Sequence, residues 1–161
     1  MIENLSLKTF FRFINPFMAF VLKSPIHWFV SFQLMLLIVI GRKTGRQFEI
    51  PVSFAKLDGV YVALTLKANQ WWRNLREGTC TAVIRGERVA CTIHIIDEDV
   101  SSIEQNLRAL INHNPLDAPF AGVRLNWRLK PNEDDLRTAA QRHVVLRLEA
   151  SGSSANTTPG S

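Results

Sequence analysis

Three cationic side chains stand in a short turn bounded by glycines. Segment 41–46 reads Gly-Arg-Lys-Thr-Gly-Arg and supplies Arg42, Lys43 and Arg46. Such side chains, with exposed backbone N–H groups, can converge on a phosphate or carboxylate, and glycine lets the backbone come close. The glycine spacing and the strand that follows differ from those of a nucleotide P-loop. The turn therefore predicts an anion-binding site, and a solvated basic turn without a ligand is the alternative.

Two adjacent tryptophans form the second candidate feature. The spacing predicts a short helix over 70–77, with Asn69 capping its first N–H groups and Gly78 ending it. Neighbouring helical residues point about 100° apart, so only one of Trp71 and Trp72 faces the core. The other is predicted to wall a pocket for a planar ring or to cap the core. Core packing alone is the alternative.

The remaining residues predict little acid, base or nucleophile chemistry. No Gly-x-Ser-x-Gly motif is present, and the histidines at 27, 94, 113 and 143 lack metal-ligand spacing. We therefore expect no metal site and leave the catalytic residues unassigned. Any reaction is expected to belong to a bound cofactor.

Two cysteines are too few for a disulfide framework. They fall in a predicted hairpin over 80–96 whose turn we place at Gly86-Glu87. That register puts Cys80 and Cys91 diagonally across the hairpin, about 7 to 8 Å apart. The sequence therefore predicts two free thiols.

The elements that must position these residues are mainly strands. Apolar runs, period-two alternation and turn residues predict six short, mostly antiparallel strands, the first of them buried on both faces. The expected fold is a mainly β split β-barrel with decorating helices. The strands are expected at 47–54, with a hairpin turn at Leu57-Asp58-Gly59 after it, and at 33–40, 60–66, 80–85, 88–96 and 144–148.

Two helices are expected outside the strands. Val100, Ile103, Leu107, Leu110 and Ile111 recur at helical spacing, which predicts an amphipathic helix that ends before Asn114-Pro115. A second helix is predicted over 131–141, because a proline and three acids begin it.

The chain divides into three parts. Residues 1–23 are expected to form a phenylalanine-rich amphipathic helix that packs on the domain or contacts a membrane surface. Residues 24–149 are the barrel domain, and residues 150–161 are expected to be disordered. The stretch 24–41 has too short an apolar part to span a bilayer, and no secretory signal is recognisable, so a cytoplasmic location is expected.

The charge is unevenly distributed along the 161 residues. The net charge is +5, with +2 in residues 1–41, +5 in 42–91 and −2 in 92–161. A region of one sign concentrates ligands of the other, which favours an anionic partner. No helix shows a basic face with base-reading side chains, so we expect no nucleic-acid binding.

Taken together, the motifs resemble the family of deazaflavin-dependent nitroreductases and quinone reductases, within the split β-barrel flavin-binding superfamily. The resemblance covers about residues 24–96 and is carried by the strand 36–40, the turn 41–46, Ile50-Pro51-Val52 and the run 71–75. It implies that the turn holds the cofactor phosphate and that the proline-bearing strand lies along the ring. The strand end before the tryptophans lines the site, the two indoles lie near the ring and substrate mouth, and Asn74 holds the loop. The implied cofactor-binding residues are Arg42, Lys43, Thr44, Gly45, Arg46, Pro51, Val52, Thr65, Leu66, Lys67, Trp71, Trp72 and Asn74.

The resemblance also implies an activity. The expected function is an oxidoreductase that uses the deazaflavin coenzyme F-420, or alternatively FMN, to transfer hydride to an apolar quinone-like, nitro or conjugated carbonyl acceptor. Family members studied as nitroreductases present C-terminal tyrosines to the substrate, whereas this chain has no tyrosine after Tyr61. The candidates to replace them are Phe120, Trp127 and the N-terminal phenylalanines. The alternative is a non-catalytic split-barrel carrier or sensor of a flavin, haem or lipid-like ligand. Monomer and homodimer are expected equally.

Overall fold

The computed structural model describes residues 34–75 and 78–152. The predictions for residues 1–33, including the amphipathic helix, and for the tail from 153 on lie outside the described residues. No helix of the described residues is long and apolar enough to cross a bilayer.

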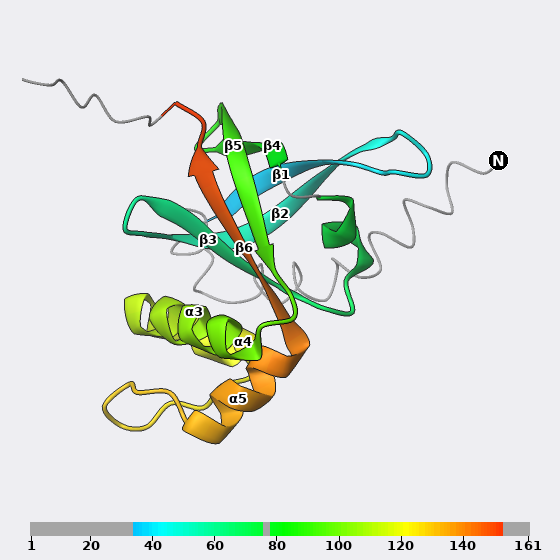
Figure 1. Ribbon diagram of the computed structural model, residues 1–161. Coiled ribbons are helices and arrows are strands. Elements are labelled where there is room, and N and C mark those ends of the chain that lie inside the picture. The colour runs from blue at the N-terminus through cyan, green and yellow to red at the C-terminus, as the bar shows by residue number, and fades with distance from the viewer. Residues whose placement is uncertain (1–33, 76–77, 153–161) are drawn as a thin grey trace, which may run out of the picture. The chain divides into compact units, whose positions relative to one another are not determined.

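Six strands form the centre of the described structure (Figure 1). They hydrogen-bond in the order β1-β2-β3-β6-β5-β4, and β1 also pairs with β4, so that the sheet closes into a barrel. Each pair with a defined register is antiparallel, which confirms the mainly β prediction and the number of strands. The strands are β1 (Leu34–Ile40), β2 (Gln47–Leu57), β3 (Val60–Leu66), β4 (Gly78–Ile84), β5 (Glu87–Ile96) and β6 (His143–Ala150).

The first strand does not have the two buried faces that its apolar run predicts. Met35, Leu37 and Val39 are buried, whereas the residues between them are half-buried and Ile40 is 59% exposed. Because neighbouring side chains point to opposite faces, β1 buries one face fully and the other only in part. An apolar run alone cannot distinguish these cases.

The β2–β3 hairpin has the turn that its sequence predicts. Leu57 pairs with Val60, which leaves Asp58 and Gly59 as a two-residue turn with φ of 49° and 85°. Positive φ at both positions is what a type I′ turn requires, and Asp-Gly is a favoured pair for it.

The β4–β5 hairpin differs from the prediction by two residues in register. Ile84 pairs with Glu87, so the turn is Arg85-Gly86 rather than Gly86-Glu87, with φ of 53° and 83°. This register places Cys80 directly opposite Cys91 instead of diagonally. Both thiols are free, as predicted.

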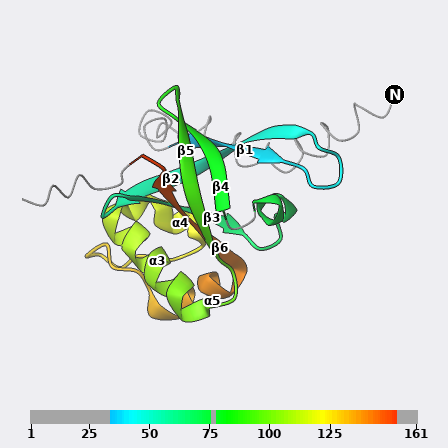
Figure 2. The ribbon, with the colours of Figure 1, turned by 45° about the horizontal axis from the view of Figure 1, so that its top comes forward.

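Two longer helices cover one side of the barrel, as Figures 1 and 2 show. Helix α3 (Val100–His113) begins at Asp99, whose carboxylate accepts a hydrogen bond from Ser102 N–H, and confirms the amphipathic prediction. Helix α5 (Glu133–Arg142) begins after Asn132, and Pro131 lies before it rather than in its first turn. The apolar layer between helices and strands contains Ala55, Val62, Ile103, Leu110, Ala140 and Val145.

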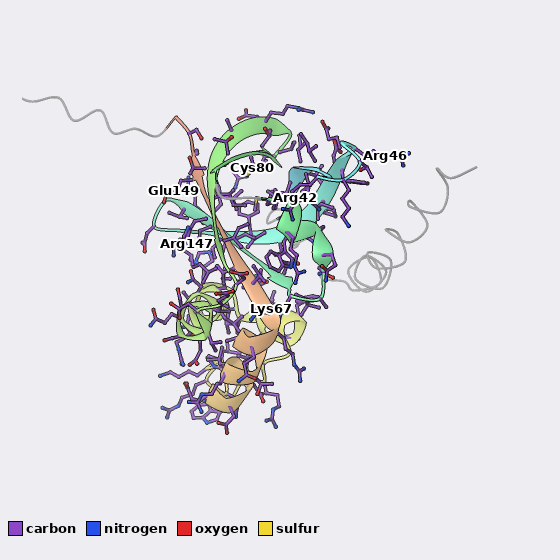
Figure 3. All side chains as sticks on the ribbon, turned by 45° about the vertical axis from the view of Figure 1, so that its right-hand side comes forward. Arg42, Arg46, Lys67, Cys80, Arg147 and Glu149 are labelled. Atoms are coloured by element: carbon purple, nitrogen blue, oxygen red, sulfur yellow. The ribbon has the colours of Figure 1, made fainter. Side chains whose placement is uncertain are left out.

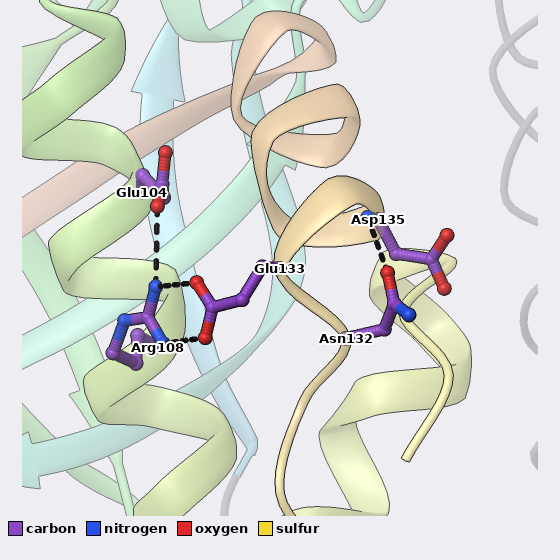
Figure 4. A network of polar contacts seen from close by, with 5 residues as sticks. All are labelled: Glu104, Arg108, Asn132, Glu133 and Asp135. Carbon is purple, nitrogen blue, oxygen red and sulfur yellow. Dashed lines mark hydrogen bonds and ion pairs between the residues drawn. The ribbon is translucent and has the colours of Figure 1, made fainter. Parts of the chain in front are cut away.

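A charged network joins the two helices at the surface (Figure 4). The guanidinium of Arg108 donates to both carboxylate oxygens of Glu133 and also to Glu104, four residues earlier in α3. The two-pronged contact fixes the orientation of the side chains as well as their charges. It holds the start of α5 against the middle of α3.

The connection between these helices contains two short elements that the sequence analysis did not predict. They are η2 (Pro115–Asp117) and α4 (Ala118–Ala121), and Leu125 then pairs with Pro131 in an isolated bridge. Ala118 and Val123 pack with the Leu107 side of α3, so the connection completes the helical layer.

Candidate functional site

The turn at 41–46 joins β1 to β2 and is closed by its own backbone. Gly41 N–H donates to the Arg46 carbonyl, and Gly45 N–H donates to the Gly41 carbonyl, both at 2.8 Å. Gly45 has a φ of 66°, which favours glycine. A Cβ on Gly41 would lie 2.9 Å from Thr44 Oγ1, so this position needs glycine for a different reason. Both glycines therefore serve the shape of the turn.

The turn presents its charges to solvent. Arg42, Lys43 and Arg46 are exposed, and none of them forms an ion pair within the described part of the chain. Figure 3 labels Arg42 and Arg46 at this end of the structure and Lys67 farther away, after β3. The turn thus offers three cations that no described acid neutralises.

Most of the backbone donors in the turn are already used. Besides the two glycine N–H groups, Arg42 N–H donates to Asn74 Oδ1 and Arg46 N–H donates to Thr44 Oγ1. The sequence analysis expected backbone and side chains to share an anion. The structure leaves mainly the side chains for that task.

Asn74 connects the turn to the tryptophan segment. Its Oδ1 accepts the hydrogen bond from Arg42 N–H at 3.2 Å, while its Nδ2 donates to the Trp71 carbonyl at 3.1 Å. The two segments lie 32 residues apart in the chain at this contact. One side chain therefore joins the backbone of the cationic turn to the backbone of the tryptophan segment.

The tryptophan segment is shorter than predicted. It is a single 3-10 turn, η1 (Gln70–Asn74), so neither the extent to 77 nor the end at Gly78 is correct. Asn69 does not cap it, because the Asn69 amide instead donates to Thr65 Oγ1 at 3.1 Å. The sequence did not reveal this contact, since Asn69 suits a helix cap equally well. Gly78 is the first residue of β4.

The two indoles have different surroundings, as the sequence analysis expects. Trp72 is 7% exposed, its Nε1–H donates to the Lys67 carbonyl, and the Arg73 guanidinium lies 5.3 Å from the centroid of its ring. Trp71 is half-buried. Trp72 is therefore a core residue, and Trp71 is the indole with surface left for a ligand.

The remaining predicted site residues lie on β2 and at the end of β3. Val52 is buried and Pro51 is half-buried, and their side chains point to opposite faces of β2. Thr65 is buried, Leu66 is 44% exposed and Lys67 N–H donates to the Arg142 carbonyl. Among the described residues, no hydrogen bond or ion pair given for the turn joins it to Pro51, Val52 or Leu66.

Two further features of the described residues limit the chemistry. No group of three or more His, Cys, Asp or Glu side chains is placed to hold a metal ion within residues 34–75 and 78–152. A shallow open depression of about 250 Å³ lies at the β5–α3 connection and is lined by residues 94–99 and Ser102. None of the predicted cofactor residues lines it.

Comparison with known proteins gives weak structural likenesses. No family model and no curated protein matches the sequence. Among solved structures, the chain is similar to the haem storage protein HutZ from Vibrio cholerae, with 12% identity over 80% of this chain and 89% of that one and a TM-score of 0.49. An F420-H2 dependent reductase gives 12% identity, 71% and 93% coverage and a TM-score of 0.44.

A third similar structure is described as a candidate 5-nitroimidazole antibiotic resistance protein from Bacteroides thetaiotaomicron. It has 9% identity, 80% coverage of both chains and a TM-score of 0.47. At such identities and TM-scores, a likeness establishes neither a family nor a function. The function proposed below therefore rests on the residues of this chain.

Proposed function

We propose that this protein is an oxidoreductase that binds the deazaflavin coenzyme F-420, with FMN as the alternative cofactor. The acceptor is an apolar quinone, nitro compound or conjugated carbonyl. The observation that supports this proposal is the Asn74 bridge, which joins the backbone of the turn with its three exposed cations to the backbone of the half-buried Trp71. A cofactor with an anionic tail and a planar ring needs both features near each other.

The donor set of the turn suits a phosphate. Arg42, Lys43 and Arg46 carry charge without a described counter-ion, and guanidinium groups match the geometry of phosphate oxygens. Since four backbone N–H groups of the turn already donate elsewhere, binding depends on these side chains. We expect each charge-assisted contact to contribute about 1.5 to 3 kcal/mol.

The ring side of the site is assigned to Trp71, Pro51 and the end of β3. An indole that keeps part of its surface open can stack on a planar ring. Thr65 is held by Asn69, which fixes the backbone that leads into Leu66 and Lys67. The role of these residues is to bind and orient the cofactor and to exclude water.

The bound cofactor would supply the hydride chemistry. The predicted site residues include no carboxylate, histidine or thiol, so this chain provides position and charge rather than a proton donor. The acceptor therefore takes its proton from water at the mouth of the site.

Cofactor titration tests the proposal. The purified full chain is titrated with F-420 and with FMN. The Arg42→Ala/Lys43→Ala variant is compared with Arg85→Asn/Arg88→Ser, which removes two exposed cations from the β4–β5 hairpin. We expect the first variant to bind at least tenfold more weakly and the control to bind like the wild type. Equal binding by both variants would refute the phosphate assignment.

The predicted site residues include no carboxylate, histidine or thiol. This also fits a non-catalytic carrier of a flavin, haem or lipid-like ligand. Turnover separates the two functions. The enzyme reduces menadione in the presence of the reduced cofactor, whereas a carrier binds the cofactor without turnover.

A further inference from the structure

The connection between α4 and α5 presents two large apolar side chains to solvent. Trp127 is 84% exposed and Leu129 is 57% exposed. They belong to the segment Asn126-Trp127-Arg128-Leu129-Lys130, which we call the tip loop. Soluble proteins commonly expose single apolar residues, but two on one tight turn, alternating with the cations Arg128 and Lys130, indicate a contact site.

The tip loop is a constrained turn. Asn126 Oδ1 accepts hydrogen bonds from the N–H groups of Arg128 and Lys130, at 2.9 and 3.0 Å. Its backbone N–H donates to the Lys130 carbonyl, and its carbonyl accepts from Leu129 N–H. The bridge between Leu125 and Pro131 closes the loop at its base. These bonds hold Leu129 at a φ of 58°, a conformation that a leucine rarely adopts.

The charge of the tip loop is positive. The Arg128 guanidinium lies 4.5 Å from the centroid of the Trp127 ring, and Lys130 is exposed. Neither cation forms an ion pair with any described residue. The nearest acids in the sequence lie at the start of α5, where Glu133 pairs with Arg108 and Asp135 pairs with Arg124. Among the described residues, Asp134 forms no ion pair.

We propose that the tip loop is a contact site for an anionic lipid membrane. An indole prefers the headgroup level of a bilayer, because its apolar ring is buried while its N–H stays hydrated. Leu129 adds apolar area beside it. Arg128 and Lys130 are placed to meet anionic headgroups as the tip inserts.

The shape of the loop favours a membrane over a protein partner. Figures 1 and 2 show the connection after α4 as a loop that projects from the helical layer. A stable protein interface buries about 800 Å² on each partner, with the anchor side chains ringed by further contacts. A projecting turn with two apolar side chains offers no such ring, but it can enter a headgroup region.

Vesicle co-sedimentation of the full chain tests this proposal, which does not depend on the cofactor site. Vesicles of phosphatidylcholine with phosphatidylglycerol are compared with vesicles of phosphatidylcholine alone. We expect Trp127→Ser/Leu129→Asn to weaken binding to the anionic vesicles at least tenfold. Arg128→Ser/Lys130→Ser weakens it about 25-fold, because each cation near an anionic surface contributes about fivefold.

The matched control is Arg85→Asn/Arg88→Ser, which removes the same charge from the β4–β5 hairpin. We expect it to change vesicle binding by less than about twofold, since charges away from the contact are screened. Residues 1–23, also predicted to contact membranes, are present in every variant. The differences between variants therefore report on the tip loop alone.

Fluorescence localises the contact independently. Brominated lipids quench the emission of an inserted indole, so Trp127→Phe should bind vesicles within about twofold of the wild type yet lose most of the quenching. The proposal is overturned if the wild type does not sediment with anionic vesicles, or if Trp127→Ser/Leu129→Asn binds them unchanged. It is also overturned if the wild type self-associates without binding vesicles and Trp127→Ser/Leu129→Asn abolishes this self-association. The partner would then be a second copy of the chain.

Discussion

The helical layer and the β1–β2 turn use their cations in opposite ways. In the helical layer, Arg108 binds Glu133 and Glu104, and Arg124 binds Asp135. In the turn, Arg42 and Arg46 form no ion pair with an acid of the described residues. A paired cation contributes to the fold but has little capacity left for a ligand. Within the described residues, the turn therefore has charge that no ion pair uses, which is the condition that the proposed anionic cofactor requires.

The largest effect is expected from a cavity in the helical layer. Leu107 is fully buried among α3, α4 and α5. Leu107→Ala should lower the free energy of unfolding by about 2 to 5 kcal/mol, because burial is lost and a cavity remains. Urea unfolding measures this, with Ala109→Ser on the exposed side of the same helix as the control. Equal midpoints for the two variants would show that the helical layer does not stabilise the barrel.

The next effect depends on pH and on Asp117 in η2. Burial raises the pKa of Asp117 to about 6, although His113 and the Asn114 amide both act to lower it. The folded state therefore holds a proton more tightly than the unfolded state, and stability falls as pH rises from about 4 to about 6.

In the Asp117→Asn variant this fall should be absent. The difference in unfolding free energy between wild type and variant should change by about 1 to 3 kcal/mol across that range, since one pKa unit corresponds to about 1.4 kcal/mol. Urea unfolding at several pH values measures the difference. A constant difference would mean that Asp117 keeps an ordinary pKa.

A smaller effect is expected where the turn meets η1. Asn74→Ala removes both hydrogen bonds of the bridge and should cost about 1 kcal/mol of stability, together with a larger loss of cofactor affinity. Asn74→Asp is the matched variant, because it keeps an acceptor for Arg42 N–H but loses the donor to the Trp71 carbonyl. Isothermal titration and urea unfolding measure the two effects. The bridge is irrelevant to binding if Asn74→Ala binds the cofactor like the wild type.

The smallest stability effect is expected from the turn cations themselves. Arg42→Ala/Lys43→Ala should change the unfolding free energy by less than about 0.5 kcal/mol, because these side chains are exposed and without a described ion-pair partner. Its cofactor affinity should nevertheless fall. A clear loss of stability would contradict the contrast drawn between the two regions.

Sequence reasoning succeeded where local signals were unambiguous. The Asp58-Gly59 turn, the apolar spacing from Val100 to Ile111 and the acids that start α5 each predict the element that is found. The relation between the tryptophans is also as predicted, because helical geometry allows only one of them into the core. These features depend on a few neighbouring residues.

The sequence-based predictions are wrong where contacts with other parts of the chain determine the local structure. Arg85 adopts a φ of 53°, a conformation that glycine adopts more readily. Because Arg85 rather than Glu87 belongs to the turn, the β4–β5 register differs from the predicted one by two residues. Asn69 was assigned to a cap but binds Thr65. The segments η2 and α4 were not predicted, since Asn114 and the packing of Ala118 define them. The assignment of site residues to a cofactor stays a prediction.

The corrected register has a chemical consequence for the thiols. Burial raises the pKa of Cys80 to about 12, with the facing Cys91 adding to the effect, and burial also raises the pKa of Cys91. Both groups therefore stay protonated at neutral pH, and the nucleophile is the thiolate. We expect alkylation by iodoacetamide at pH 8 to be far slower in the folded protein than after unfolding in urea. Equal rates would contradict the burial of these side chains.

The closed order of the six strands limits how this domain can associate. In an open sheet, an outer strand offers a row of unsatisfied N–H and C=O groups onto which a further strand can add, from a peptide or from another molecule. Here β1 is paired on both sides, by β2 and β4, so the described barrel has no such row. Adding a strand of a second molecule beside β1 would therefore require one of these two pairings to open first.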